Sequence, residues 1–284
     1  MAEWYQESAE VQKAFCDAPG NVEVTMDGTC VNTTEGAREV RVGLVSKRKR
    51  GQGVLPERWG NRNRQELPEI ETSIAFAAVE DSGKFKKRVN EWRRRLCLGS
   101  TSDISVLGDG ATWIWNITDE VFGKVRACLD VYHGLEHVSA TGKVYGEQTK
   151  EYKQWQTETT LEFVASGFEL IEERLNGLEQ EERTDKEKES LRLLRGYLEN
   201  NRERLCYRER LAEGRAIGSG QIEGACKHLI GRRLKQTWAK WKVERVDKMA
   251  ILCALRYCNQ WEKYWIQAKY CRNIFTHPLA CLNR

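Results

Sequence analysis

The chain has 284 residues, 40% of them hydrophobic and 31% charged, which is long enough for a sizeable core and typical of a soluble protein. It has no run of about 18 apolar residues and no secretory signal, which excludes an integral membrane protein and argues against export. The ten cysteines are scattered without a Cys-x-x-Cys pair, so we expect reduced thiols and no structural zinc site.

The net charge of +4 is unevenly distributed. Residues 147–189 carry 13 acidic and 6 basic side chains, a net of −7, which leaves +11 for the rest of the chain. The positive charge is concentrated at 47–50, 84–95 and 227–245. This division favours a nucleic acid as the partner of the basic part.

The first half of the chain predicts an α/β core after a helical extension at residues 1–20. Alternation of apolar and polar residues predicts antiparallel strands at 22–26 and 39–45, and further strands are predicted at 72–79, 104–108 and 127–129. Helical spacing predicts helices at 84–98 and 112–122. Asp27-Gly28 is a strong turn signal, so we expect the first strand to end there.

The second half is predicted to be mostly helical. Two long charged helices, near 147–178 and 186–212, would form a hairpin, and a glycine-rich turn would lead into a helix from Gln221. A last helix is expected at about 244–269. The predicted organisation is an extension (1–20), the first part of the core (21–133), a helical insertion (134–215), the C-terminal helices of the core (216–270) and a tail (271–284).

Three acidic residues have distinctive positions in this order. Asp27 follows the first strand, Asp109 follows the fourth, and Glu223 lies in the first turn of the helix after the insertion, where the helix dipole favours a negative charge. If strands one and four are neighbours, both aspartates emerge at one edge of the sheet, and a packed helix can add the glutamate. Three such carboxylates suit Mg²⁺ or Mn²⁺. Taken singly, each Asp-Gly is more often a turn and the glutamate more often a surface residue.

With this ordered trio, the sequence resembles the DDE transposases with an RNase H-like catalytic core, and most closely the bacterial ISKra4-type insertion-sequence transposases. The resemblance covers roughly residues 20–265. It is carried by Met26-Asp27-Gly28-Thr29, Arg38-Glu39-Val40-Arg41-Val42-Gly43, Leu107-Gly108-Asp109-Gly110-Ala111-Thr112-Trp113-Ile114, Leu129-Asp130-Xaa-Tyr132-His133 and Ile217-Gly218-Ser219-Gly220-Xaa-Ile222-Glu223-Xaa-Ala225-Cys226-Lys227-His228.

The resemblance implies an RNase H-like mixed sheet flanked by helices, interrupted by an all-α insertion before the helix with the last acidic residue. It also implies that Asp27, Asp109 and Glu223 are the catalytic residues and hold two Mg²⁺ (or Mn²⁺) ions. The implied reaction is strand cleavage and strand transfer at the ends of a transposon. The expected partner is DNA, bound by a homodimer or higher oligomer in the cytoplasm at the nucleoid, without a membrane.

Asp130 and His133 match a Cys/Asp-x-x-His motif that supports the active site in related transposases, so we expect them to orient the catalytic residues. The alternative pairs His133 with His137 as zinc ligands, but no third ligand is evident in the sequence.

Basic residues follow Glu223 at helical spacing. Lys227 either forms an intrahelical pair with Glu223 or contacts a DNA phosphate. The DNA-binding track is predicted to comprise Lys227, His228, Arg232, Arg233 and Lys235. Among the tryptophans, Trp59, Trp238 and Trp241 are candidates for stacking on bases, whereas Trp92, Trp113 and Trp261 are expected in the core.

Complete family members carry a DNA-binding region before the first aspartate, whereas 26 residues precede Asp27 here. The resemblance is therefore to the catalytic part, and recognition of transposon ends by this chain alone is in question. Three other functions stay open: a catalytically silent DNA-binding protein derived from a transposase, an RNase H-fold nuclease or resolvase, and a two-carboxylate glycosidase. The last would need an acidic cleft, which the basic surroundings of Glu223 do not favour.

Overall fold

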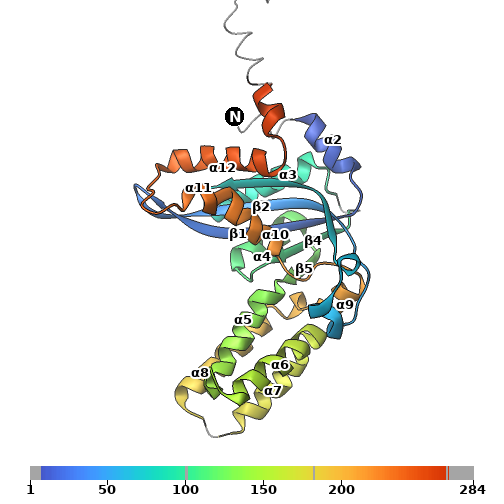
Figure 1. Cartoon of the computed structure of the whole chain (residues 1–284), viewed down its shortest axis with the longest axis vertical. Helices are drawn as coiled ribbons and strands as arrows, with labels where there is room; N and C mark the ends of the chain where they lie inside the picture. Colours follow the sequence, from blue (N-terminus) through green and yellow to red (C-terminus); the bar gives the residue numbers. More distant parts are fainter. Residues whose placement is uncertain (1–7, 100–101, 182, 267, 269–284) are drawn as a thin grey trace, which may run out of the picture.

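A mixed sheet of five strands organises the computed structural model, which describes residues 8–99, 102–181, 183–266 and 268 (Figure 1). The strands are β1 (Asn21–Thr33), β2 (Gly36–Lys49), β3 (Glu69–Ala78), β4 (Ile104–Gly108) and β5 (Arg126–Leu129), in the order β3-β2-β1-β4-β5. The first three strands are antiparallel, β4 is parallel to β1, and β5 is parallel to β4. The predicted α/β class and all five predicted strands are confirmed, and strands one and four are neighbours.

The predicted end of the first strand is wrong. β1 continues through Asp27, which pairs with Val42 of β2, and the hairpin turns after Thr33. The pairing of β1 with β4, however, stops at Thr25. The extension is stable because the far end of β1 is covered by the C-terminal helices, against which Val31 is buried. Asp27 therefore lies on a continuous strand, just beyond the point where β4 ends.

The two faces of the sheet bury separate apolar clusters. Alternate residues Val22, Val24 and Met26 face α3 (Ser82–Arg95) and α4 (Thr112–Phe122), together with the N-terminal helix α2 (Ala9–Asp17). On the other face, Val42, Leu44, Ala75 and Ala77 form the second cluster. This period of two places Asp27 on the second face, because successive side chains of a strand point to opposite sides.

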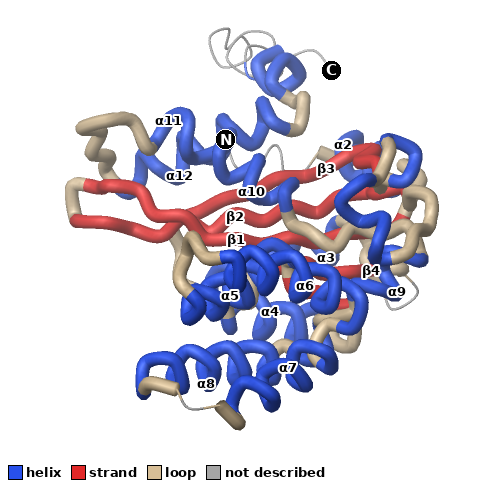
Figure 2. The backbone as a smooth tube through the Cα atoms, turned by 60° about the horizontal axis from the view of Figure 1, so that its bottom comes forward, coloured by secondary structure: helices blue, strands red, loops and turns tan. Residues whose placement is uncertain are grey.

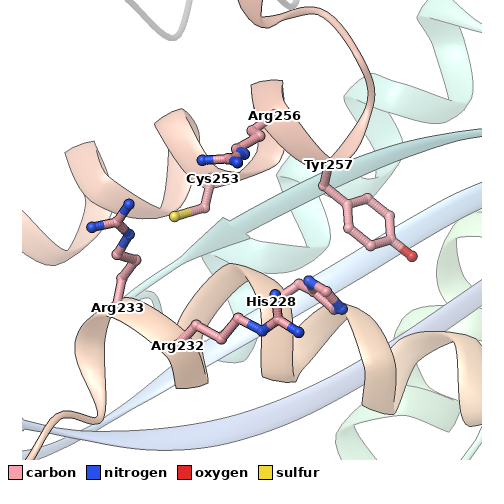
Figure 3. Close-up of a pocket in the computed structure, with 6 residues that line it drawn as sticks. All are labelled: His228, Arg232, Arg233, Cys253, Arg256 and Tyr257. Carbon is pink, nitrogen blue, oxygen red and sulfur yellow. The ribbon is translucent and has the colours of Figure 1, made fainter.

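The C-terminal helices cover the second face (Figure 2). They are α10 (Gly220–Cys226), the π-helical turn η5 (Lys227–Gly231), α11 (Arg232–Leu234) and α12 (Val243–Tyr257). A hollow of about 590 Å³ lies between η5–α11 and α12 (Figure 3). The predicted helix 244–269 is shorter than expected, because the chain turns at Asn259 (φ 56°) before helical residues 261–266. The tail 271–284 lies outside the described residues.

The segment between the two parts of the core forms a helical arm below the sheet (Figure 1). Its α-helices are α5 (Val131–Gly142), α6 (Lys150–Ser166), α7 (Glu169–Glu179), α8 (Asp185–Asn200) and α9 (Tyr207–Ala212). α5 packs against α6 and α8, and α7 packs against the same two helices. The predicted pair of long helices is wrong in detail: Gly167, at φ +68°, separates α6 from α7, and residues 201–206 separate α8 from α9.

Two short 3₁₀ helices, η1 (Pro56–Asn61) and η2 (Arg64–Glu66), lie in the long connection from β2 to β3. Of the tryptophans expected in the core, Trp92 is buried and Trp113 is half-buried, whereas Trp261 is exposed. Within the described ranges, none of the helices is both long enough and apolar enough to cross a bilayer.

Candidate active site

Asp27 is held between its own strand and helix α10. Its Oδ1 accepts the Gly28 N–H at 2.6 Å, and its Oδ2 accepts a hydrogen bond from the Cys226 thiol, with 3.3 Å between Sγ and Oδ2. Burial raises the pKa of Asp27; the two hydrogen bonds and His133 oppose this shift, while the charge of Asp109 adds to it. Burial, followed by the charge of Asp27, also raises the pKa of Cys226, so the thiol stays protonated and can donate. Asp27 is thus a carboxylate kept partly out of water.

Asp109 and Asp130 come directly after the neighbouring parallel strands β4 and β5. Gly108 and Leu129, the last residues of these strands, are in register, and the Asp130 N–H donates to the Gly108 carbonyl at 2.7 Å. Because the carboxyl ends of parallel strands meet at one edge of a sheet, the two aspartates lie side by side. Asp109 Oδ1 accepts the Ala111 N–H at 2.9 Å, which fixes the turn into α4.

Asp130 is completely buried and begins α5. Its Oδ1 accepts the N–H groups of Tyr132 (2.7 Å) and His133 (3.0 Å), as an N-cap does, and its Oδ2 accepts the Ser219 N–H. One carboxylate therefore joins the start of the arm to the turn that precedes α10. Ser219 occupies the N-cap position of α10, but its hydroxyl makes no capping hydrogen bond.

Asp130, His133 and Glu223 form the tightest group of potential metal ligands among the described residues. Each offers one ligand atom, and these atoms all lie within 4.8 Å of one another. Glu223 is exposed at the surface of α10, His133 is half-buried and Asp130 is buried. The structure thus places the two predicted supporting residues directly beside the predicted catalytic glutamate.

Asp27 and Asp109 lie outside this tight group: Asp109 follows β4, and Asp27 lies on β1 just beyond the point where β4 ends. Asp27 contacts Cys226, which is three residues after Glu223 on α10, and its pKa responds to both Asp109 and His133. Carboxylate oxygens are hard ligands that fit Mg²⁺ or Mn²⁺, and an imidazole nitrogen among them is better suited to Mn²⁺. The donor set therefore fits a divalent cation.

His137 does not take part in a metal group with His133. Its ring stacks on Tyr197 of α8, with ring centroids 3.8 Å apart and an interplanar angle of 20°. Among the described residues, the candidate site therefore has no second histidine, which the zinc alternative requires.

Tyr197 and Cys226 are the contacts at the site that the sequence did not indicate. The Tyr197 hydroxyl is 3.5 Å from the Asp109 carbonyl oxygen, and its pKa is raised by burial and by the charges of Asp109 and Asp130. Tyr197 lies in a charged helical stretch 88 residues from Asp109, so no local pattern marks it. In the sequence, Cys226 looks like an ordinary apolar residue of an amphipathic helix. Only the packing of α10 on β1 brings its thiol to Asp27.

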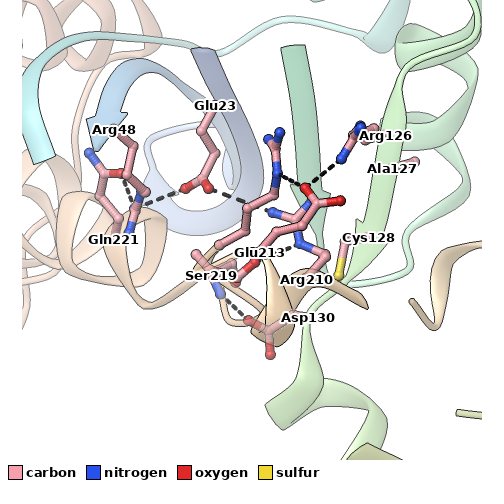
Figure 4. A network of polar contacts seen from close by, with 12 residues as sticks. Glu23, Arg48, Arg126, Ala127, Cys128, Asp130, Arg210, Glu213, Ser219 and Gln221 are labelled. Atoms are coloured by element: carbon pink, nitrogen blue, oxygen red, sulfur yellow. Dashed lines mark hydrogen bonds and ion pairs between the residues drawn. The ribbon is translucent and has the colours of Figure 1, made fainter. Parts of the chain in front are cut away.

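A buried polar network fixes the first turn of α10 (Figure 4). Arg48 of β2 is 2.9 Å from the carboxylate of Glu23 on β1 and donates to Gln221 Oε1 at 2.8 Å. Gln221 in turn donates to the hydroxyl of Ser46 at 2.8 Å. Because Gln221 is two residues before Glu223, this network positions the glutamate relative to the sheet.

The segment that leads from the arm to α10 is clamped by two more buried arginines, of which Arg210 is labelled in Figure 4. Arg210 donates from Nε to the Ala216 carbonyl at 2.7 Å and lies 3.9 Å from Glu23. Arg215 donates to both Asp103 and Glu213 at 2.6 Å. The predicted glycine-rich turn that leads into α10 is thus a fixed connection rather than a loose loop.

The predicted DNA-binding residues are all exposed, but they divide into two groups. His228, Arg232 and Arg233 line the hollow of Figure 3 with Arg256, Cys253 and Tyr257 of α12, and no acidic residue lines it. Lys235 instead donates to the hydroxyl of Thr29 on β1. Within the described ranges Lys227 forms no ion pair, so the alternative of an intrahelical pair with Glu223 is not found. Bound phosphate would therefore meet unpaired positive charge here.

The candidate stacking tryptophans also differ from one another. Trp238 is 95% exposed, and Trp241 is half-buried with its backbone paired to Asn32 and Thr34. Trp59 packs against Tyr132, with centroids 5.8 Å apart. Of the three, only Trp59 lies beside the carboxylate group.

The raised pKa of Asp27 predicts a stability effect. The folded-state pKa lies above the unfolded value, so ionisation of this carboxyl favours the unfolded state, and the folding free energy weakens as the pH rises from the unfolded value through the folded one. In EDTA at pH 7, Asp27→Asn is therefore expected to raise the Tm, and the gain should vanish below about pH 3.9, the ordinary pKa of Asp. Thermal denaturation of both proteins across this range is the measurement. An Asn variant that is less stable than the wild type at pH 7 would contradict the expectation.

No protein-family model matches the chain, and no curated protein is significantly similar to it in sequence.

Proposed function

We propose that this chain is the catalytic core of a DDE transposase, which cleaves DNA strands at transposon ends and joins them to a target. One observation carries the proposal: strands one and four are neighbours, Asp109 and Asp130 directly follow β4 and β5, Asp27 lies on β1 just beyond the end of β4, and Glu223 groups with Asp130 and His133. An RNase H-like core of this kind needs that neighbour relation, with a helix adding the last carboxylate. The helical arm before α10 fits the same plan.

Asp27, Asp109 and Glu223 would hold the divalent cations, with Asp130 and His133 beside Glu223. Two Mg²⁺ or Mn²⁺ ions would activate an attacking hydroxyl and stabilise the leaving oxygen of a phosphodiester. The protein's part is to orient the ligands. Cys226 and Gly28 fix Asp27 by hydrogen bonds, Ala111 fixes Asp109, and the Arg48–Gln221 contact fixes the helix of Glu223.

DNA is the partner that the surface charge favours. Exposed basic side chains follow Glu223 along η5 and α11, whereas the acidic residues are concentrated in the arm. Such a surface attracts the phosphate backbone next to the carboxylates without reading its sequence. Because a transposition reaction uses two DNA ends, a homodimer or higher oligomer on DNA is part of the proposal.

The proposal is tested by incubating the purified chain with supercoiled plasmid and short duplex DNA in Mn²⁺, Mg²⁺ or EDTA. Metal-dependent nicking, together with covalent joining of the duplex to the plasmid, is the expected result. Nicking without joined products would point to a nuclease or resolvase instead. Binding of DNA without any nicking would point to a catalytically silent protein, and either result would contradict the proposal.

A further inference from the structure

A second hollow, of about 320 Å³, lies beside the candidate active site. It is formed between the β2–β3 connection, the first turn of α5 and the turn that precedes α10. Its lining includes Trp59, Arg62, Leu67, Ile70, Tyr132 and Gly218. The size is at the small end of the range for ligand sites, which fits a single ring system and its substituents rather than a peptide or a duplex.

The hollow gathers apolar and aromatic side chains that are exposed to solvent. Tyr132 is 52% exposed, Leu67 44% and Ile70 42%. The ring of Trp59 lies at 47° to that of Tyr132, so the two rings form a tilted pair and not a closed stack. Because exposed aromatic surface in a concave place is characteristic of a binding site, these side chains indicate a ligand with a flat apolar face.

Arg62 adds hydrogen-bond donors to the same place. The side chain is half-buried, and its Nε donates to the Trp59 carbonyl at 3.0 Å. In the described part of the chain its terminal nitrogens have neither an ion pair nor a hydrogen bond. Arg48, the other arginine of the lining, is already paired with Glu23 and Gln221. The free guanidinium of Arg62 is therefore the group that can meet a polar edge or a phosphate.

The hollow is contiguous with the carboxylate group. Tyr132 lies between Asp130 and His133 in the sequence, and it leans on the backbone of Gly218. A Cβ at position 218 would lie 2.9 Å from a ring carbon of Tyr132, so only glycine permits this approach. Gly218 and Gln221 then lead along the chain to Glu223. An occupant of the hollow would therefore lie next to the carboxylate group.

We infer that this hollow binds one unpaired nucleobase of a DNA strand, stacked on Trp59 and Tyr132, with Arg62 donating to the base edge or to the flanking phosphate. The inference rests on the proposed function, since it takes the ligand to be the strand held at the carboxylates. The chemistry of a nucleobase on a free nucleotide is the same, so the experiment has to distinguish the two sources. Stacking of this kind tolerates any base, because every base has a π-face.

The test uses a short single-stranded oligothymidylate with one 2-aminopurine, titrated with the full chain in EDTA so that no cleavage occurs. A change in 2-aminopurine fluorescence on binding is expected for the wild type. Trp59→Ala and Tyr132→Ala should each weaken binding by about 5- to 150-fold, the fold-change that corresponds to the usual cost of about 1–3 kcal/mol for losing one stacking side chain. Arg62→Gln should weaken it as well.

Trp265→Ala is the matched control, because Trp265 is an exposed tryptophan outside the hollow and is not a predicted DNA contact. It should leave the fluorescence titration unchanged. Tyr132 is exposed, so its Ala variant keeps the test valid if Trp59→Ala fails to fold, and thermal denaturation identifies such a failure. Unchanged binding by the folded Tyr132→Ala and Arg62→Gln variants would overturn the inference.

Two further measurements distinguish a DNA strand from a free nucleotide, and the hollow from the transposase function. If deoxyadenosine monophosphate competes as well as the oligonucleotide, the occupant is a free nucleotide and the inference about the strand is wrong. Metal-dependent nicking is measured in parallel with the wild type. If the wild type nicks DNA but the hollow variants bind the oligonucleotide as tightly as the wild type, the base-binding hollow is refuted and the transposase function is not. Loss of binding in those variants without any nicking by the wild type refutes the transposase function and leaves the base-binding hollow standing.

Discussion

Glu223→Gln is expected to lower metal-dependent strand cleavage by on the order of 10²–10³-fold, the usual effect of removing one electrostatic group that acts on the transition state. The amide keeps the shape of the side chain, which lies on the exposed face of α10, but it removes the negative charge that completes the group with Asp130 and His133. The same loss is expected for Asp27→Asn and Asp109→Asn. Nicking of supercoiled plasmid in Mn²⁺ is the measurement.

Glu244→Gln is the matched control, since Glu244 also lies in the first turn of a helix and is exposed, but on α12. It should cleave like the wild type. DNA affinity, measured in EDTA by fluorescence anisotropy, should be retained or increased in Glu223→Gln, because a negative charge near the phosphates is removed. Full cleavage by Glu223→Gln would remove this residue from the catalytic group.

Arg48→Ala is expected to destabilise the fold by about 3–5 kcal/mol, because it leaves the carboxylate of Glu23 buried without its closest partner. Glu23 is 1% exposed, and its other cation, Arg210, is 3.9 Å away. A loss of this size lowers the Tm by on the order of 10 °C in a chain of this length. Urea unfolding followed by circular dichroism gives the free energy directly.

Two variants test whether the buried charge is the cause. Lys49→Ala removes the neighbouring cation, whose pair with Glu71 is at the surface, and it should change stability little. Glu23→Gln in the Arg48→Ala background should recover part of the loss, because the unpaired charge is gone. If the double variant is as unstable as Arg48→Ala, lost packing of the Arg48 stem and its contact with Gln221 explain the effect instead.

The sequence predicted the parts of this fold that depend on local pattern. Alternation marked the strands at 22–26 and 39–45, and short apolar runs marked the others. The ends of β4 and β5 placed Asp109 and Asp130 correctly, because a strand followed by a turn is a local signal. The predicted end of the first strand at Asp27-Gly28 was wrong because it also rested on a local signal. The local preference of this dipeptide for a turn is overruled by β2 and the helices that cover the far end of β1.

The site itself was only partly predictable. The order of Asp27, Asp109 and Glu223 indicated a shared edge, and Asp130 and His133 were expected nearby. Their tight grouping with Glu223 depends on how α10 packs on the sheet, and the buried network of Glu23, Arg48 and Gln221 joins positions up to 198 residues apart, so no local pattern encodes it.

The helical arm meets the core at two places that matter for redesign. Tyr197 of α8 contacts the backbone of Asp109, and the chain that leaves the arm is clamped by Arg210 and by the bond from Ser219 to Asp130. An excision of the whole arm would therefore disturb the position of an aspartate and the entry to α10 at once. The far tip, where α7 connects to α8, has neither attachment. Grafted sequences or affinity tags belong at that tip, and not at the base of the arm.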